Sequence, residues 1–147
     1  QLKRSISVNN SYIHVAVAAV VNNKGEVLVS QRKQGTHLGG YWEFPGGKIK
    51  DGESAAAACI REIKEEVNLD VQIDRHLTQV KHAYTHFRIV MEVFCCKYVS
   101  GRVALRGPVA FRWIRIDEYQ KFPFPRANHK FIPMLKGLQL TSETGKP

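Results

Sequence analysis

At 147 residues, with 44% hydrophobic and 24% charged side chains, the chain has the size and composition of one globular domain with its own core. It carries 22 Lys and Arg against 13 Asp and Glu, a formal net charge of +9 that suits a phosphate-bearing partner such as a nucleotide. Nucleic acid is a possible partner but is not favoured, because the basic residues are scattered with no run of five. No apolar run approaches the ~20 residues of a membrane helix, so we expect no membrane partner.

The chain ends and the cysteines point to a cytoplasmic protein. The start, QLKRSISVNN, has basic residues with no apolar segment behind them, which is not typical of a secretory signal. Cys59, Cys95 and Cys96 are odd in number and lack metal-ligand spacing, so we expect reduced thiols. We predict a single domain over residues 1–147, monomeric or homodimeric, with residues 1–11 and 140–147 as flexible termini.

The first third of the chain reads as strands. Residues 12–21 are β-branched and mostly apolar, the turn-forming residues 22–25 follow, and residues 26–32 resume as a strand, which together predict a hairpin. We expect a loop over residues 35–41 and a short strand over 42–44. The sequence Pro45-Gly46-Gly47 forces a turn after that strand.

A helix over residues 54–67 is well marked at its start. Ser54 is a good N-cap, and the alanines that follow it have the highest helix propensity. An apolar stripe at the helical period predicts the buried face, namely Ala56, Ile60, Ile63 and Val67.

The remainder alternates between strands and short helical segments. Residues 71–73, 77–84, 87–98 and 110–116 read as strands, and residues 117–119 as a helical turn. Residues 127–138 predict a second helix, with Phe131, Met134 and Leu135 facing inward. The fold class is therefore α/β, a mixed sheet flanked by two helices.

Acidic side chains gather in one segment of this basic chain. Asp51, Glu53, Glu62, Glu65 and Glu66 fall within 16 residues, and the last three share one edge of the predicted helix. Like charges at this spacing destabilise a helix unless a cation lies among them. Ligation by carboxylate oxygens suits Mg²⁺ or Mn²⁺ rather than zinc.

The same segment resembles the signature of the Nudix hydrolases. The matching positions are Gly47, Glu53, Arg61, Glu62, Ile63, Glu65, Glu66 and Leu69, with Asn68 where the family usually has glycine. A helix C-terminus needs a left-handed residue there, and Asn is the next most tolerant type. The resemblance implies an α/β/α sandwich and hydrolysis of a nucleoside diphosphate linked to another group.

The resemblance also implies roles for the motif residues. Glu62, Glu65, Glu66 and the backbone oxygen of Gly47 would hold Mg²⁺, for which Mn²⁺ could substitute. Arg61 would pair with Glu53 and support the site, although a surface ion pair is the alternative reading. Catalysis would thus fall to Glu53, Arg61, Glu62, Glu65 and Glu66.

Outside the motif the chain resembles the MutT-type branch, which hydrolyses 8-oxo-dGTP and other nucleoside triphosphates to the monophosphate and pyrophosphate. By position, Arg32 would contact phosphate, although it could instead be a solvated strand end. Asn128 would form hydrogen bonds with a purine edge through its amide, although it could instead be a helix N-cap or turn residue. Tyr84 and Phe87 could stack on a base. No acid lies between Glu92 and Asp117, where that branch has a glutamate, so Glu65, Glu66 or the metal alone would activate water.

Two other interpretations stay open. The chain also resembles the non-hydrolytic, Nudix-like domain of adenine DNA glycosylases, which recognises a damaged base in DNA. That domain usually has an eroded motif, whereas this chain keeps Glu62, Glu65 and Glu66. The other interpretation is a Nudix hydrolase acting on CTP, ADP-ribose or the 5′ triphosphate of RNA.

Overall fold

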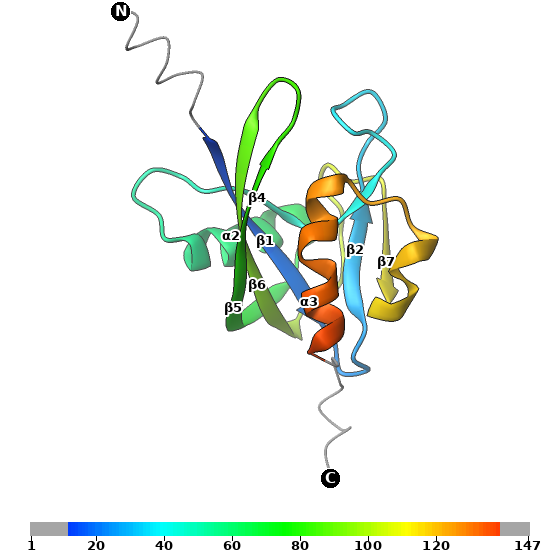
Figure 1. Cartoon of the computed structure of the whole chain (residues 1–147). Coiled ribbons are helices and arrows are strands. Elements are labelled where there is room, and N and C mark those ends of the chain that lie inside the picture. Colours follow the sequence, from blue (N-terminus) through cyan, green and yellow to red (C-terminus); the bar gives the residue numbers. More distant parts are fainter. Residues whose placement is uncertain (1–11, 139–147) are drawn as a thin grey trace, which may run out of the picture.

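The computed structural model describes residues 12–138, so the expected flexible termini, 1–11 and 140–147, lie outside the described residues. A mixed sheet separates the helix α2 from a second layer of short helices, η1, η2 and α3 (Figure 1). This arrangement confirms the predicted α/β class. Among residues 12–138, no helix has the length and apolar character needed to cross a membrane.

The sheet has seven strands in the described part of the chain. Its main path is β3-β2-β1-β6-β5, and β4 pairs with β1 while β7 pairs with β2. β1 and β6 run parallel, and the other pairs are antiparallel. The strands are β1 (Tyr12–Val21), β2 (Val27–Gln31), β3 (Trp42–Glu43), β4 (Gly46–Lys48), β5 (Asp70–Ala83), β6 (Arg88–Ser100) and β7 (Ala110–Ile114).

Side chains of β1 alternate between two cores, one on each face of the sheet. Ala16, Ala18 and Val20 pack against α2, whereas Val17 and Ala19 pack against η2 and α3. Cys59, Cys95 and Cys96 are free and buried within these cores.

Helix α2 (Ala55–Val67) begins and ends as predicted. The Ser54 side chain accepts a hydrogen bond of 3.1 Å from the backbone N–H of Ala57, and Asn68 is left-handed with φ 66°. Ile63 and Val67 of the predicted stripe are buried and Ala56 packs against the same core, but Ile60 was wrong, because it is 41% exposed and Cys59 is buried instead. Glu62 and Glu66 lie at the border of this buried face.

The predicted second helix is interrupted. Residues 126–130 form the 3-10 helix η2 (Arg126–Lys130), and α3 (Ile132–Gly137) follows it. Pro133 has no N–H to donate backwards, so it fits the first turn of a helix but not the interior of a longer one. Phe131 and Leu135 are buried as expected, whereas Met134 is 42% exposed and that part of the prediction was wrong.

Other element boundaries differ slightly. β5 is continuous through the expected gap at residues 74–76, where the register with β6 shifts. β7 ends at Ile114, and the predicted helical turn after it is the 3-10 helix η1 (Ile116–Lys121).

Candidate active site

The Pro45-Gly46-Gly47 turn brings backbone against the acidic edge of α2. β4 pairs with β1 through Gly46 and Gly47, and α2 packs over both strands. A Cβ at Gly47 would overlap the carboxyl group of Glu62, while a Cβ at Gly46 would overlap the backbone of Ala16. Both positions therefore need glycine. Gly47 leaves room for the carboxyl group of Glu62, and Gly46 leaves room for the neighbouring strand β1.

Glu66 is the most perturbed carboxylate in this turn. Its Oε1 accepts a hydrogen bond of 3.0 Å from the backbone N–H of Gly46. Burial, followed by the charges of Glu43 and Glu62, raises the pKa of Glu66 to about 8, although the Gly46 N–H opposes the shift. The charge of Arg32 also opposes the shift, so burial and the two neighbouring carboxylates outweigh both stabilising contacts.

Arg61 organises the other acids of the motif. Its Nε and Nη2 donate to the two Glu53 oxygens at 2.6 and 2.9 Å, and Nη2 also donates to the Lys48 carbonyl. Its Nη1 donates to Glu62 at 2.9 Å and to Glu65 at 3.2 Å. The hydrogen bonds from Arg61, and then from the Lys50 backbone, lower the pKa of Glu53 to about 2. The expected Arg61–Glu53 pair is present.

The structure brings together two of the three helix glutamates. Glu62 and Glu66 lie at the Gly46-Gly47 turn, but the Glu65 side chain is 54% exposed and bound to Arg61. Within residues 12–138, no group of three or more His, Cys, Asp or Glu side chains is arranged to hold a metal ion. Full convergence of Glu62, Glu65 and Glu66 is therefore not found, because Arg61 lies between Glu62 and Glu65.

The donor set at the turn nevertheless fits a hard divalent cation. Two carboxylates and the adjacent glycine backbone offer only oxygen ligands, which Mg²⁺ and Mn²⁺ prefer. Burial, and then the charge of Glu43, raise the pKa of Glu66, and a cation bound there would act against both effects.

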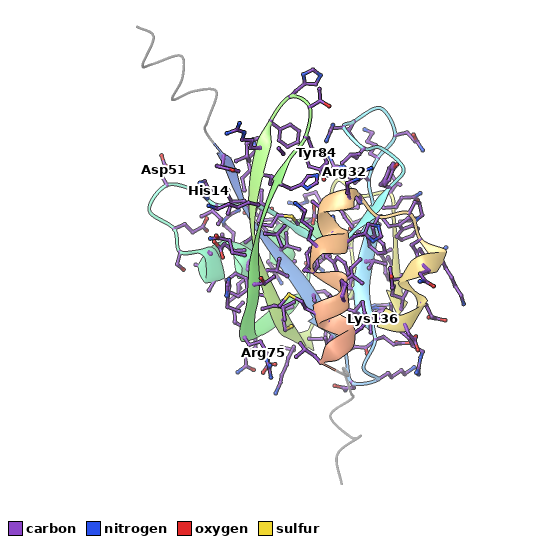
Figure 2. The ribbon with its side chains drawn as sticks, viewed as in Figure 1. His14, Arg32, Asp51, Arg75, Tyr84 and Lys136 are labelled. Atoms are coloured by element: carbon purple, nitrogen blue, oxygen red, sulfur yellow. The ribbon has the colours of Figure 1, made fainter. Side chains whose placement is uncertain are left out.

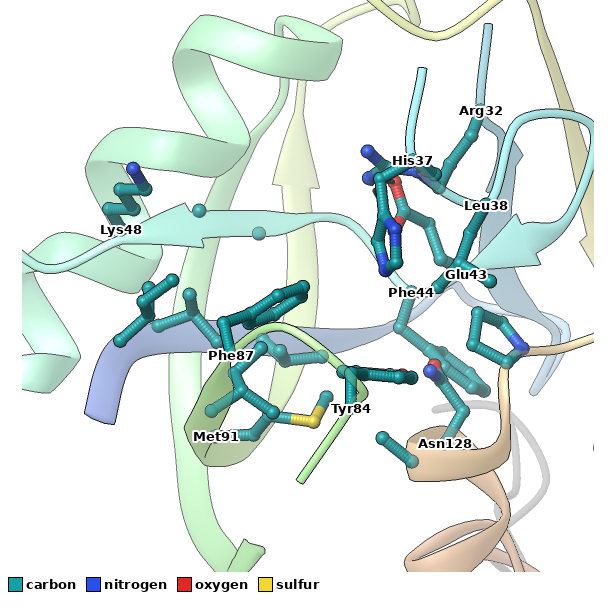
Figure 3. Close-up of a pocket in the computed structure, with 18 of the residues that line it drawn as sticks. Arg32, His37, Leu38, Glu43, Phe44, Lys48, Tyr84, Phe87, Met91 and Asn128 are labelled. Atoms are coloured by element: carbon teal, nitrogen blue, oxygen red, sulfur yellow. Dashed lines mark hydrogen bonds and ion pairs between the residues drawn. The ribbon is translucent and has the colours of Figure 1, made fainter. Parts of the chain in front are cut away.

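A pocket of about 340 Å³ opens beside this turn. Figure 3 shows Arg32, Tyr84, Phe87 and Asn128 around it, so the four residues predicted to bind substrate line one cavity. Figure 2 shows Arg32 and Tyr84 at the same end of the molecule. The remaining lining residues are Ile13, Val15, Val17, His37, Leu38, Glu43, Phe44, Gly46, Gly47, Lys48, Glu66, Ile89, Met91, Pro125 and Ala127.

Asn128 presents an amide without a protein partner to this pocket. The residue is 5% exposed, and only its backbone N–H and C=O bond to other residues of the described chain, Pro125 and Phe131. Because Asn128 lines the pocket, a ligand there can reach this amide. Asn128 is therefore a turn residue by its backbone and a candidate ligand-binding residue by its side chain.

Arg32 holds the loop between β2 and β3. Its Nε donates to the His37 carbonyl at 2.8 Å, and its Nη1 donates to Glu43 at 3.2 and 3.3 Å. The His37 ring meets the Tyr84 and Phe87 rings edge to face, with centroids 5.4 and 5.1 Å apart. Arg32 is thus more than a solvated strand end.

Sequence reasoning missed Glu43, His37 and Leu38. Burial raises the pKa of Glu43, and Arg32 opposes the shift. The signal for Glu43 was an acid between Trp42 and Phe44, directly before the turn. His37 and Leu38 lie in a segment read only as loop, and no local pattern announced that Leu38 would adopt φ 58°.

Comparisons with known proteins agree with this geometry. The family model described as NUDIX domain matches residues 16–134. An 8-oxo-dGTP diphosphatase of Proteus vulgaris is 35% identical over 82 residues, 56% of this chain and 73% of that protein. A CTP pyrophosphohydrolase of Escherichia coli (strain K12) is 26% identical over 120 residues, 82% of this chain and 87% of that protein. The crystal structure of a MutT protein from Methanosarcina mazei Go1 superposes with a TM-score of 0.79 at 25% identity, covering 87% of this chain and 95% of that one.

Proposed function

This chain belongs to the Nudix family and is a hydrolase of phosphoric anhydride bonds, and from that premise we propose that it cleaves nucleoside triphosphates to the monophosphate and pyrophosphate. An oxidised guanine nucleotide such as 8-oxo-dGTP is the proposed substrate, and cleansing of the cytoplasmic nucleotide pool is the proposed role. The names of the similar 8-oxo-dGTP diphosphatases support this choice.

The unpartnered amide of Asn128 is the observation that carries the proposal. An amide offers both a donor and an acceptor, so it can form two hydrogen bonds with the edge of a purine. Tyr84, Phe87 and His37 supply aromatic rings along the same cavity, on which a base could stack. A base seated there satisfies the polar group that the protein alone leaves without a partner.

The same pocket also suits the phosphates. Gly46, Gly47, Lys48, Glu66 and Arg32 all line it, with Lys48 and Arg32 on opposite sides (Figure 3). Bound Mg²⁺ would supply charge neutralisation to a polyphosphate and a lowered pKa to water. Among the chain's own groups, Lys48 and Arg32 would orient the phosphates, while Arg61 would hold Glu53 and Glu62 in place.

Glu65 is our candidate to accept the proton of the attacking water. Its Oε1 accepts from Arg61, and its Oε2 makes no hydrogen bond with another residue of the described chain. Glu53, in contrast, has both oxygens engaged by Arg61. A carboxylate with a free oxygen is the better candidate of the two.

The intact acidic motif favours a hydrolase over a passive reader of damaged bases. A base-recognition domain needs the Asn128 pocket but not the packed arrangement of Gly47, Glu62 and Glu66. A CTP hydrolase is a second candidate, because the Asn128 amide can also pair with a pyrimidine edge.

A kcat/KM comparison over 8-oxo-dGTP, dGTP, CTP, ADP-ribose and 5′-triphosphorylated RNA tests the proposal, with products identified by phosphorus NMR. We expect 8-oxo-dGTP to give the highest value and pyrophosphate to be the second product. A best value for CTP would leave the reaction intact but overturn the base assignment. Turnover of none of these compounds, in either Mg²⁺ or Mn²⁺, would contradict the proposed reaction.

A further inference from the structure

A second cavity of about 220 Å³ lies against the first. Its lining residues are Arg32, Lys33, Thr36, Glu43, Glu66, Gly107 and Pro108. Arg32, Glu43 and Glu66 line both cavities, so these three side chains form a shared wall. Figure 3 shows Arg32 and Glu43 side by side on the edge of the first pocket.

The loop before β7 fixes the far side of this cavity. The backbone N–H of Arg106 donates to the Glu66 carbonyl at 2.9 Å, and the N–H of Ala104 donates to the Val67 carbonyl at 3.1 Å. Gly107 has φ 112°, and no atom lies within 4 Å of the position that a Cβ would take there. The wall is thus anchored to the end of α2 while space remains open beside Gly107.

Cationic groups of this cavity have unused donors. Arg32 commits Nε to His37 and Nη1 to Glu43, and its Nη2 has no hydrogen-bond partner among residues 12–138. The Lys33 ammonium likewise makes no hydrogen bond or ion pair within that range. The Thr36 hydroxyl donates to the Lys33 carbonyl at 2.6 Å, which closes a tight turn and fixes where the Lys33 side chain starts.

The two acids of the shared wall are partly compensated. Glu43 is paired with Arg32, and Glu66 accepts the Gly46 N–H. An anion entering the cavity therefore meets the free donors of Arg32 and Lys33, both of which form strong charge-assisted hydrogen bonds with phosphate oxygens.

We propose that the second cavity is the subsite for the leaving pyrophosphate, with Lys33 as its specific binding residue. This inference rests on the proposed function, because the nucleoside occupies the Asn128 pocket and the phosphate chain must continue past Glu66. The volume accommodates two linked phosphate groups. A nucleoside diphosphate would fill only half of the subsite, so Lys33 favours triphosphates over diphosphates.

Calorimetry can measure the direct binding of pyrophosphate to the protein, with and without Mg²⁺. This measurement tests the subsite independently of turnover. We expect Lys33→Ala to weaken pyrophosphate binding about tenfold, the usual scale for a lost charge-assisted contact. Lys33→Arg retains the charge and should bind nearly as the wild type does. Lys24→Ala, in the exposed β1–β2 turn, is the matched control and should change nothing.

Kinetics give a second readout. Lys33→Ala should raise KM for the best triphosphate, leave KM for the corresponding diphosphate nearly unchanged, and weaken product inhibition by pyrophosphate. Pyrophosphate binding that is absent, or identical in the wild type and Lys33→Ala, overturns the subsite. If pyrophosphate binding does not depend on Lys33 while nucleotides are still hydrolysed, only the proposed subsite is wrong. If pyrophosphate binding depends on Lys33 but no nucleotide is hydrolysed, only the proposed function is wrong.

Discussion

The backbone N–H of Gly46 donates a 3.0 Å hydrogen bond to the carboxylate of Glu66, twenty residues further along the chain. This bond ties the glycine turn to the acidic edge of α2. It only partly offsets the burial of Glu66 and the nearby charges of Glu43 and Glu62, so the pKa of Glu66 stays raised, at about 8. The fold therefore disfavours the ionised form of Glu66.

The Glu66→Gln variant should be more stable than the wild type when metal is absent and the pH is high. The folded pKa of Glu66, about 8, lies above the ordinary value of 4.5, so its protonated form favours folding. That contribution is complete below about pH 4.5 and is lost as the pH rises through about 8. Urea unfolding in the presence of a chelator should give similar free energies of unfolding for the wild type and Glu66→Gln at acidic pH. As the pH rises, the free energy of unfolding of Glu66→Gln should increasingly exceed that of the wild type.

Addition of Mg²⁺ should reverse the comparison. A cation at the turn would stabilise the ionised wild-type carboxylate and raise its free energy of unfolding, but would help the glutamine variant less. Parallel pH profiles for the two proteins in chelator would contradict the view that the fold disfavours the ionised form of Glu66.

Gly47→Ala and Gly46→Ala should fail in different ways. A methyl group at Gly47 meets the movable end of Glu62, so we expect a stable protein whose metal affinity and activity fall by about 10–100-fold. A methyl group at Gly46 meets the Ala16 backbone, which cannot move aside, so we expect a loss of about 1–3 kcal/mol in the free energy of unfolding. Chemical denaturation and a metal titration of each variant separate the two effects, and equal stability losses would refute the distinction.

Replacing Arg61 by lysine should impair metal binding while preserving the positive charge. Lysine cannot reproduce the two-pronged contact with Glu53 together with the contacts to Glu62 and Glu65. We expect metal affinity to fall about 10–100-fold, as for other residues that orient metal ligands. Isothermal titration with Mn²⁺ gives the affinity, with Arg75→Lys, at an exposed position of β5, as the control. Unchanged affinity would make the Arg61 cluster an ordinary surface ion-pair network.

Asn128→Ala should reduce kcat/KM without reducing stability. The amide makes no hydrogen bond within the described chain, so its removal costs the fold little, whereas a bound base loses two hydrogen bonds. We expect a fall of about tenfold or more in kcat/KM for the best purine substrate, mainly through KM. Asn128→Asp keeps the size but removes the donor, and should change the order of preference among bases. Wild-type kinetics for both variants would exclude Asn128 from base recognition.

Local signals in the sequence predicted much of the scaffold. The Ser54 and Asn68 caps of α2 depend on neighbouring residues alone, and they were predicted because capping is local chemistry. The phase of the buried stripe was misjudged at Ile60, because Cys59 and Ile60 are both compatible with a core and only the sheet decides between them. Pro133 carried the information that the last helix would be short.

The site was less predictable because its parts come from distant segments. Glu43 becomes part of the site only because β3 pairs with β2 and brings its charge near Glu66. His37 becomes part of the site only because its loop contacts Tyr84 and Phe87 at the β5–β6 hairpin. The turn of Glu65 towards Arg61 is a rotamer choice among competing carboxylates, and spacing along a helix does not determine it.

We propose that the backbone oxygen of Gly47 and the carboxylates of Glu62 and Glu66 hold a divalent ion that acts on the pyrophosphate linkage. Anomalous diffraction from crystals soaked in Mn²⁺ tests it most directly. We predict a strong peak bounded by the Gly47 carbonyl oxygen and the carboxylates of Glu62 and Glu66, and its loss in a Glu62→Gln, Glu66→Gln double variant. An empty groove in the wild type, or a peak elsewhere that survives in the variant, would contradict the claim.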